Sequence, residues 1–265
     1  MKYKTYLKNK NLSTNTINVY YKNYGIWKAF LKNNNPTKSN FVKFIKLYEV
    51  NHKPASVNLM YHSILSIFKF EKRWKLLNEC RDIKLPKQEI TLQKVLSLNN
   101  FENMKNKICI NNFYQQRNWL IFCFMFFTGI RVSELFEINI KLISNQRLLI
   151  YGKGKKTRLV YINDYLLHLL NNWKNKKIPI NKRGKLLSYK QVNNIIKNIS
   201  MHNLNIKLSP HSLRRSYATN LIKKNINLEI VRKTLGHSNI NTTSRYIQYT
   251  DEEILEEIKN CYNNL

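Results

Sequence analysis

Hydrophobic residues recur at spacings of three and four along the first third of the chain, which is the period of an amphipathic helix. Ser13 is a candidate N-cap for the first run, which ends near Pro36. A second run covers Lys38 to Tyr48, and a third opens at Pro54. The apolar positions of the first and third runs are Ile17, Tyr20, Tyr21, Tyr24, Trp27, Phe30 and Leu31, and Val57, Leu59, Met60, Ile64, Leu65, Ile67 and Phe68. Residues 1–85 are therefore predicted to form a compact helical bundle.

The segment from Arg81 to Glu89 breaks this period and contains Pro86, so it is the candidate linker. Beyond it the helical pattern returns, interrupted once by two short β-branched and aromatic runs, 147–151 and 157–162, around a Gly-Lys-Gly turn typical of a hairpin. The predicted helices of this part are 97–107, 111–127, one from Ser133, 164–174, 189–200, 210–224 and 227–235. The expected fold class is mostly α with a small β-sheet (α+β), in two domains of residues 1–85 and 90–265.

The balance of charge adds a partner to this picture. Lys and Arg number 46 against 15 Asp and Glu, a formal charge of +31, which attracts polyanions whatever the fold. Hydrophobic residues at 43% indicate a folded protein rather than a disordered polyelectrolyte. Double-stranded DNA is the expected partner, although A-rich codons alone could also enrich Lys at a solvated surface.

Other classes of protein find little support in the sequence. The four cysteines form no C-x-x-C pair and have no histidine at ligand spacing, so neither a metal nor a cofactor is expected. The N-terminus lacks the apolar run of a secretory signal. The longest apolar stretch, Trp119 to Phe127, has half of the roughly 20 residues that a bilayer span requires. We expect a soluble cytoplasmic protein associated with the nucleoid, and no membrane partner.

Three short motifs carry candidate chemistry. They are Thr128-Gly129-Ile130-Arg131-Val132-Ser133-Glu134-Leu135, then Pro210-His211-Ser212-Leu213-Arg214-Arg215, and then Leu235-Gly236-His237 with Tyr246 nine residues after the histidine. Cleaving a phosphodiester builds negative charge on the phosphate oxygens and on the leaving 5′ oxygen, so it needs fixed cations and a proton donor. The planar fork of Arg131 and of Arg214 is suited to binding phosphate oxygens.

This ordered set resembles the active site of the tyrosine recombinases, or phage-type integrases, and most closely the Xer-like ones. The resemblance implies the following roles. Tyr246 attacks the phosphate and forms a 3′-phosphotyrosyl link; Arg131, Arg214 and His237 hold the phosphate oxygens; His211 assists proton removal; and Lys153 is the general acid. The helices of residues 1–85 resemble the family's core-binding domain, and the two domains would form a clamp around DNA.

Several alternatives stay open at this point. Tyr249 lies one helical turn after Tyr246, and Lys155 or Lys156 could replace Lys153. Arg215 stands where the family usually has histidine. Glu134 could orient Arg131 or form an unimportant surface ion pair.

The resemblance also implies a site-specific DNA recombinase that exchanges strands between two sites. It would act as a homotetramer on paired sites, or together with a related recombinase, with Ile254, Leu255 and Ile258 docking the tail on a neighbouring subunit. The alternative for the tail is packing on its own domain. The alternatives for function are type IB topoisomerase-like DNA relaxation and a non-catalytic basic DNA-binding regulator.

Overall fold

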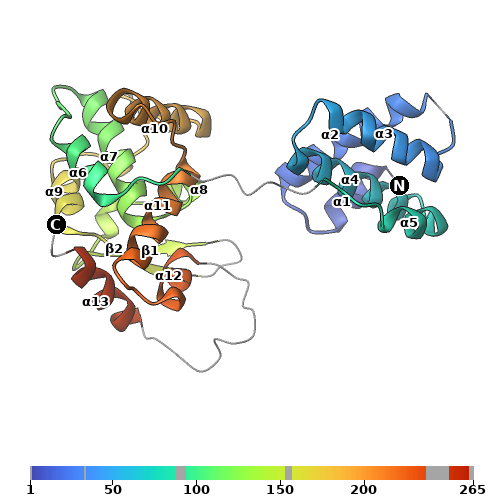
Figure 1. The fold of residues 1–265 in the computed structure, drawn as a ribbon. Helices are drawn as coiled ribbons and strands as arrows, with labels where there is room; N and C mark the ends of the chain where they lie inside the picture. The colour runs from blue at the N-terminus through green and yellow to red at the C-terminus, as the bar shows by residue number, and fades with distance from the viewer. Residues whose placement is uncertain (1, 33, 87–93, 153–156, 237–250, 263–265) are drawn as a thin grey trace. The chain divides into compact units, whose positions relative to one another are not determined.

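The computed structural model of the chain describes residues 2–32, 34–86, 94–152, 157–236 and 251–262. The chain divides into two compact units, Met1–Thr91 and Leu92–Leu265, each with its own hydrophobic core (Figure 1). The described residues are mostly helical, with one small two-stranded sheet. This is the fold class predicted from the sequence.

The first unit is built from helices alone within its described residues. They are α1 (Tyr3–Asn9), α2 (Thr14–Leu31), α3 (Lys38–Val50), α4 (Pro54–Phe70) and α5 (Trp74–Arg81). The three predicted helices are α2, α3 and α4, and the Ser13 hydroxyl caps α2 by accepting the Thr16 N–H at 3.2 Å. The short helices α1 and α5 were not predicted. The predicted apolar faces are wrong at Tyr21 on α2, which is 47% exposed, and at Leu59 on α4, which is 43% exposed. Leu59 lies about 200° around the helix from Val57 and therefore off the apolar stripe.

Aromatic packing and one polar pair hold α2 against α3 and α4. The buried ring of Trp27 meets those of Phe44 and Phe68 edge-on, an arrangement that aromatic quadrupoles favour. On the same helix, the Asn23 Nδ2 donates to Ser63 Oγ at 2.9 Å in the interior. Burying this pair is tolerated because the Ser63 hydroxyl, which accepts from Asn23, donates in turn to the Leu59 carbonyl at 2.7 Å.

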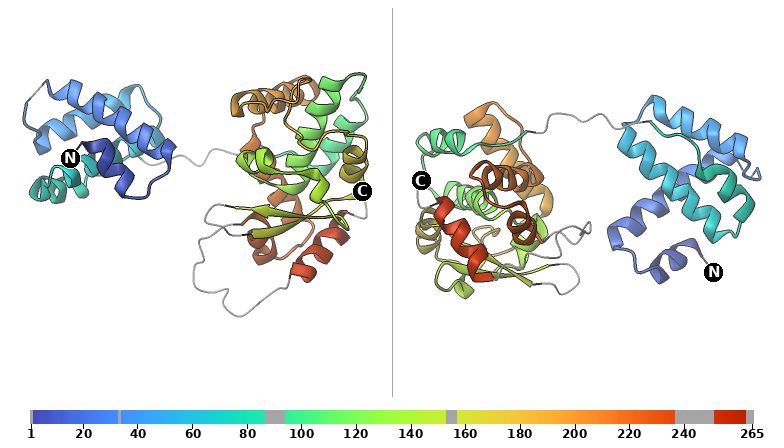
Figure 2. Two further views of the ribbon diagram at one scale, coloured as in Figure 1. Left: turned by 180° about the vertical axis from the view of Figure 1, so that it is seen from behind. Right: turned by 60° about the horizontal axis from the view of Figure 1, so that its bottom comes forward.

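The second unit contains the sheet and the remaining helices. Its elements are α6 (Leu98–Lys105), α7 (Phe113–Thr128), α8 (Val132–Glu137), the 3-10 turn η1 (Ile140–Leu142), β1 (Arg147–Tyr151), β2 (Thr157–Tyr161), α9 (Asp164–Asn171), α10 (Tyr189–Leu204), α11 (Pro210–Lys223), α12 (Leu228–Leu235) and α13 (Asp251–Tyr262). The strands pair antiparallel, with Ile150 opposite Arg158, and α12 and α13 both pack against β2 (Figure 2). The predicted hairpin is therefore confirmed. In this single chain α13 buries Ile254, Leu255 and Ile258 on its own domain, which was the alternative for the tail.

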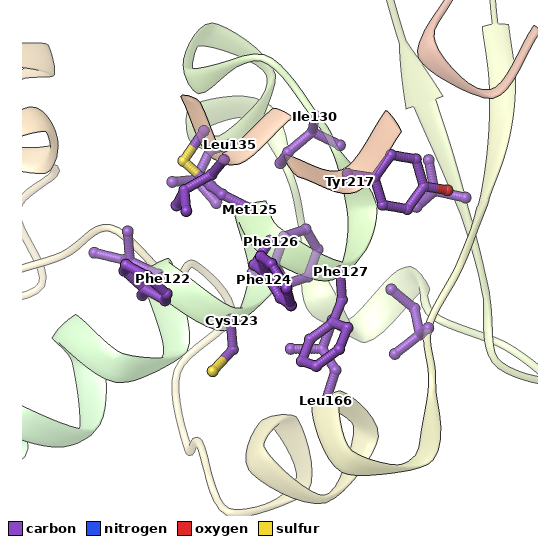
Figure 3. Packing of buried hydrophobic residues seen from close by; sticks show 14 of the residues in the cluster. Phe122, Cys123, Phe124, Met125, Phe126, Phe127, Ile130, Leu135, Leu166 and Tyr217 are labelled. Atoms are coloured by element: carbon purple, nitrogen blue, oxygen red, sulfur yellow. The ribbon is translucent and has the colours of Figure 1, made fainter. Parts of the chain in front are cut away.

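Helix α7 is the centre of the second core. Every residue from Trp119 to Thr128 is buried, and α9, α10 and α11 pack around the helix (Figure 3). A helix covered on all sides needs no polar face, which explains the unbroken apolar run in the sequence. Among the described residues no helix combines the length and the hydropathy needed to cross a bilayer.

The start of the second unit is tied to α11. The Leu96 N–H donates to Ser216 Oγ at 2.7 Å, and the Leu96 carbonyl accepts from Asn220 Nδ2 at 3.0 Å. Ser216 and Asn220 are one helical turn apart, so one face of α11 holds both backbone groups of Leu96. These hydrogen bonds fix α11, the helix that carries Arg214, to the start of the second unit.

The turn after α7 requires glycine. Gly129 has a left-handed φ of 60°, and a Cβ there would lie 2.4 Å from Cδ1 of Tyr217. We expect Gly129→Ala to lower the free energy of unfolding by about 2–3 kcal/mol, because a left-handed alanine and an overpacked core each cost about 1 kcal/mol or more. Urea denaturation measures this change.

Gly184→Ala is the matched control within the same unit. Its φ of 75° is equally left-handed, but a Cβ would meet no atom within 4 Å. It should therefore cost only the backbone term, about 1 kcal/mol. Equal losses for the two variants would show that the contact with Tyr217 does not matter.

Candidate active site

The ends of two helices frame the candidate site. Gly129 ends α7 and Gly236 ends α12, both in the left-handed conformation that closes a helix. The helices predicted for residues 111–127 and 227–235 end within one residue of these observed ends. Each helix end presents carbonyl groups that have no partner within their own helix, so these carbonyls are ready acceptors for cationic side chains.

Arg214 binds both of these helix ends. Helix α11 starts as predicted, with Ser209 Oγ accepting the Ser212 N–H at 3.2 Å and Pro210 in its first turn. One turn later the Arg214 side chain points inward and is only 8% exposed. Its Nη1 donates to the Gly129 carbonyl at 2.6 Å and its Nη2 to the Leu235 carbonyl. The acceptors are neutral, so the positive charge of Arg214 is not cancelled.

The pKa of Arg214 reflects this unneutralised positive charge. Burial, together with the nearby positive charges of Arg131 and Arg158, lowers the pKa of the Arg214 guanidinium to about 10. At neutral pH the group remains protonated. A buried cation among other cations favours the arrival of an anion, which would relieve the repulsion.

Arg131 lies at the start of α8, which begins at Val132, one residue before the predicted Ser133. Its Nη2 donates to the Gly236 carbonyl at 3.3 Å, next along the chain from the carbonyl that binds Arg214. Its Nη1 donates to Glu134 at 3.0 Å, and its backbone N–H donates to the same carboxylate at 2.7 Å. The Arg131 side chain is 38% exposed and is therefore open to a ligand.

Glu134 is a buried connector rather than a surface ion-pair partner. Its side chain is 6% exposed, and besides Arg131 it accepts from Nη1 and Nη2 of Arg158 at 3.0 and 2.7 Å. Arg158 on β2 was not predicted as a site residue. One signal in the sequence could have found it: Arg158 lies two residues before the buried Val160, so it is a charged residue on the inward face of the strand.

The pKa of Glu134 reflects this contact. Burial raises it, but the hydrogen bonds from Arg158 and Arg131 outweigh burial, and the net pKa is lowered. A carboxyl whose pKa is depressed by folding stabilises the protein above its unfolded pKa of about 4.3. That contribution is lost as the pH falls through the folded value.

We therefore expect Glu134→Gln to lower the free energy of unfolding by roughly 2–3 kcal/mol at pH 7, because Arg158 loses its buried counter-charge. The difference from the wild type should narrow as the pH falls below about 4, where the wild-type carboxylate is itself protonated. Urea titrations at pH 7 and at low pH compare the two proteins. A difference that stays constant with pH would contradict the ionic role of Glu134.

The other predicted site residues divide into two groups. His211 is exposed on the first turn of α11, three residues before Arg214 on the same helix. Arg215, the residue after Arg214, is half-buried. Lys153, His237 and Tyr246 lie outside the described residues, as do their rivals Lys155, Lys156 and Tyr249. The structure thus brings together Arg131 and Arg214 and adds Glu134 and Arg158 to them.

Comparison with known proteins identifies the family to which this chain belongs. The phage integrase family matches residues 90–253. Tyrosine recombinase XerA of Pyrococcus furiosus is 30% identical, over 98% of this chain and 93% of its own length. Tyrosine recombinase XerD of Staphylococcus epidermidis is 28% identical, over 92% of this chain and 91% of its own.

Solved structures share the fold. XerH site-specific recombinase bound to its difH substrate, in a pre-cleavage complex, superposes with a TM-score of 0.67 at 24% identity, covering 91% of this chain and 78% of XerH. A lambda integrase tetramer bound to a Holliday junction gives a TM-score of 0.73 at 17% identity, covering 92% and 78%. Neither the topoisomerase nor the regulator alternative is favoured by these similarities. The match over residues 90–253 and the likeness to XerA along nearly the whole chain show that this protein belongs to the phage integrase family and is a tyrosine site-specific DNA recombinase.

Proposed function

We propose that this recombinase cleaves DNA with Tyr246, at a phosphate held by Arg131 and Arg214. One observation carries the proposal: the two guanidinium groups, distant in sequence, bind the carbonyls of the consecutive residues Gly236 and Leu235. Two cations that bind the carbonyls of one helix end can both bind the same phosphate. Among the described residues, the carbonyls of Gly129 and Leu235 accept two of the five N–H groups of Arg214, and the other three can donate to phosphate oxygens.

The proposed reaction exchanges one phosphoester for another. The phenolic oxygen of Tyr246 forms a bond to phosphorus while the bond to the 5′ oxygen breaks. His211 assists removal of the phenolic proton, and Lys153 protonates the leaving 5′ oxygen. The product is a 3′-phosphotyrosyl link, from which the 5′-hydroxyl of a second DNA strand displaces the tyrosine. The energy of the broken bond is kept in the link, so resealing needs no ATP.

The arginines stabilise the transition state of this exchange, together with His237. Negative charge grows on the non-bridging oxygens as the phenolate attacks, and guanidinium groups fixed in place bind that charge more strongly than mobile water does. Arg214 is nearly buried, and it is oriented before substrate arrives by its two carbonyl acceptors. Its orientation therefore costs no reorganisation during the reaction.

We further propose that residues 1–85 are the core-binding domain and residues 90–265 the catalytic domain. The net charge of +31 supports DNA contact beyond the active site. In the first unit, lysines lie over tyrosine rings, as Lys4 does over Tyr21 and Lys28 over Tyr24, which presents cations on a rigid aromatic surface. Such lysines are suited to following a phosphate backbone.

The enzyme is proposed to act as a homotetramer on paired DNA sites, alone or with a related recombinase. The lambda integrase structure that shares its fold is a tetramer on a Holliday junction, and strand exchange between two duplexes requires four cleavages. Light scattering of the protein with a DNA that carries paired sites would give the mass of the complex. A complex that contains only one or two chains during strand exchange would contradict the tetramer.

Trapping the covalent complex tests the central proposal. Nicked substrates built from repeats near the gene release a short fragment on cleavage, so the attached enzyme cannot reseal the strand. We expect a DNA adduct on a peptide that contains Tyr246, joined to a 3′ phosphate. An adduct on Tyr249 would move the nucleophile, and no adduct on any such DNA would reject the mechanism. Relaxation of a plasmid without a recombination site would favour the topoisomerase reaction.

A further inference from the structure

We propose that Arg158 is a positioning residue for DNA cleavage: it holds Glu134 in the orientation that fixes Arg131. This inference rests on the proposed function of Arg131 at the phosphate. Arg158 lies on β2, whereas Arg131 and Glu134 lie at the start of α8. Arg158 therefore ties the sheet to the segment that carries the phosphate-binding arginine.

Glu134 is the link between the two arginines. Its two carboxylate oxygens accept four hydrogen bonds, two from the Arg158 guanidinium, one from the backbone of Arg131 and one from Arg131 Nη1. The pair from Arg158 is bidentate, and a bidentate fork fixes the plane of a carboxylate as well as its distance. Without Arg158 the carboxylate could rotate, and the guanidinium of Arg131 would lose its fixed partner.

A second contact places Arg158 beside the other anchor of Arg131. A Cβ on Gly236 would lie 3.3 Å from Nη1 of Arg158, and the Gly236 carbonyl accepts from Arg131 Nη2. Arg158 thus packs against Gly236 and donates hydrogen bonds to Glu134. These are the two residues that bind the Arg131 guanidinium. Both anchors of the Arg131 guanidinium depend on the position of Arg158.

The energetics favour a functional reason for a buried arginine here. The Arg158 side chain is 9% exposed, and its Nε is buried with no hydrogen-bond partner among the described residues. An unsatisfied buried donor is unfavourable, and buried ion pairs are often replaced by apolar side chains without loss of stability. A buried ion pair is therefore weak evidence for a role in stability alone, and the bonds from Arg158 to Glu134 supply a second role, the orientation of Arg131.

The test compares Arg158→Met with wild type on two substrates, an ordinary phosphodiester and a neutral methylphosphonate at the cleavage position. We expect single-turnover cleavage of the phosphodiester to slow by roughly 10–30-fold, the loss of one well-placed charged hydrogen bond, with DNA affinity unchanged. On the methylphosphonate the loss should shrink to within about 3-fold, because the neutral group develops less charge for Arg131 to stabilise.

Matched variants sharpen the comparison. Arg131→Ala should show the same substrate dependence with a larger effect, and Arg158→Lys should recover part of the rate because it restores charge without the bidentate fork. Arg183→Met removes an exposed arginine of the same unit and should change nothing. An equal loss on both substrates for Arg158→Met would mean that Arg158 acts through folding alone, and it would overturn the proposal.

A measurement without DNA separates this proposal from the proposed function. In the free protein, Glu134 restricts rotation of the Arg131 guanidinium, so the two ¹⁵Nη nuclei of Arg131 should give distinct NMR signals. Arg131→Lys assigns them by their disappearance. Arg158→Met should merge the two signals through faster rotation. Unchanged signals would overturn the role of Arg158 even if the enzyme cleaves DNA, and merged signals would support it even if Tyr246 is not the nucleophile.

Discussion

Tyr246→Phe is expected to abolish covalent attachment to DNA, lowering the rate of adduct formation by roughly 10⁴-fold or more. Phenylalanine keeps the ring and removes the oxygen that attacks phosphorus, and loss of a nucleophile is among the largest single effects on enzyme rates. Binding should survive, because the arginines and the basic surface are unchanged. The measurement is single-turnover adduct formation on the nicked substrate, together with a gel-shift assay of affinity.

Tyr249→Phe is the matched control for this experiment. It makes the same chemical change three residues further along the chain, and its adduct rate should stay within about 3-fold of wild type if Tyr249 is not the nucleophile. A reversal of the two results would make Tyr249 the nucleophile. If both variants still bind DNA, recombine it and form adducts, neither tyrosine performs the chemistry.

The helices that frame the site could be predicted because their signals are local. Ser209 and Pro210 mark where α11 begins, and Gly129 and Gly236 mark where α7 and α12 end. Each signal depends on the backbone within a few residues of it, so it can be read from one stretch of sequence. The fold class and the placement of Arg214 on α11 followed from these signals.

Tertiary contacts were less accessible to sequence reasoning. The bond between Arg158 and Glu134 joins a strand to a helix start, and Ser216 binds the distant backbone of Leu96. Neither contact has a period or a spacing that reveals it, because both depend on how elements pack after they form. The inward position of Arg158 on its strand was the available clue, since a charge among buried positions needs a partner.

The choice of acceptors explains how the site remains cationic. In the part of the chain that the structure describes, Arg214 binds carbonyl groups and no carboxylate, whereas the carboxylate of Glu134 is shared by Arg131 and Arg158. The guanidinium groups of Arg131, Arg158 and Arg214 therefore outnumber the carboxylate of Glu134, and the excess positive charge can bind the phosphate. Placing acidic residues at all three arginines would orient them equally well but would weaken their attraction for DNA.

This arrangement makes Arg214 the residue whose removal should slow cleavage most after the nucleophile. We expect Arg214→Ala to lower the rate of adduct formation on the order of 10³-fold, because it removes a transition-state donor and also releases the ends of α7 and α12. Arg214→Lys should recover little, since an ammonium cannot bind both carbonyls and still present a fork to the phosphate. Single-turnover kinetics measure both effects.

Arg214→Met separates this catalytic role from a role in folding. Folding lowers the pKa of Arg214 to about 10, so the charged side chain opposes folding at every pH below that value, and the opposition fades only as the pH rises from there toward the unfolded pKa. Removing the charge should therefore not unfold the protein, because the relief of burial offsets the lost carbonyl bonds. An inactive Arg214→Met with a wild-type urea midpoint would place the defect in the chemistry. A collapse of stability in parallel with activity would instead make Arg214 mainly a clamp between the two helix ends.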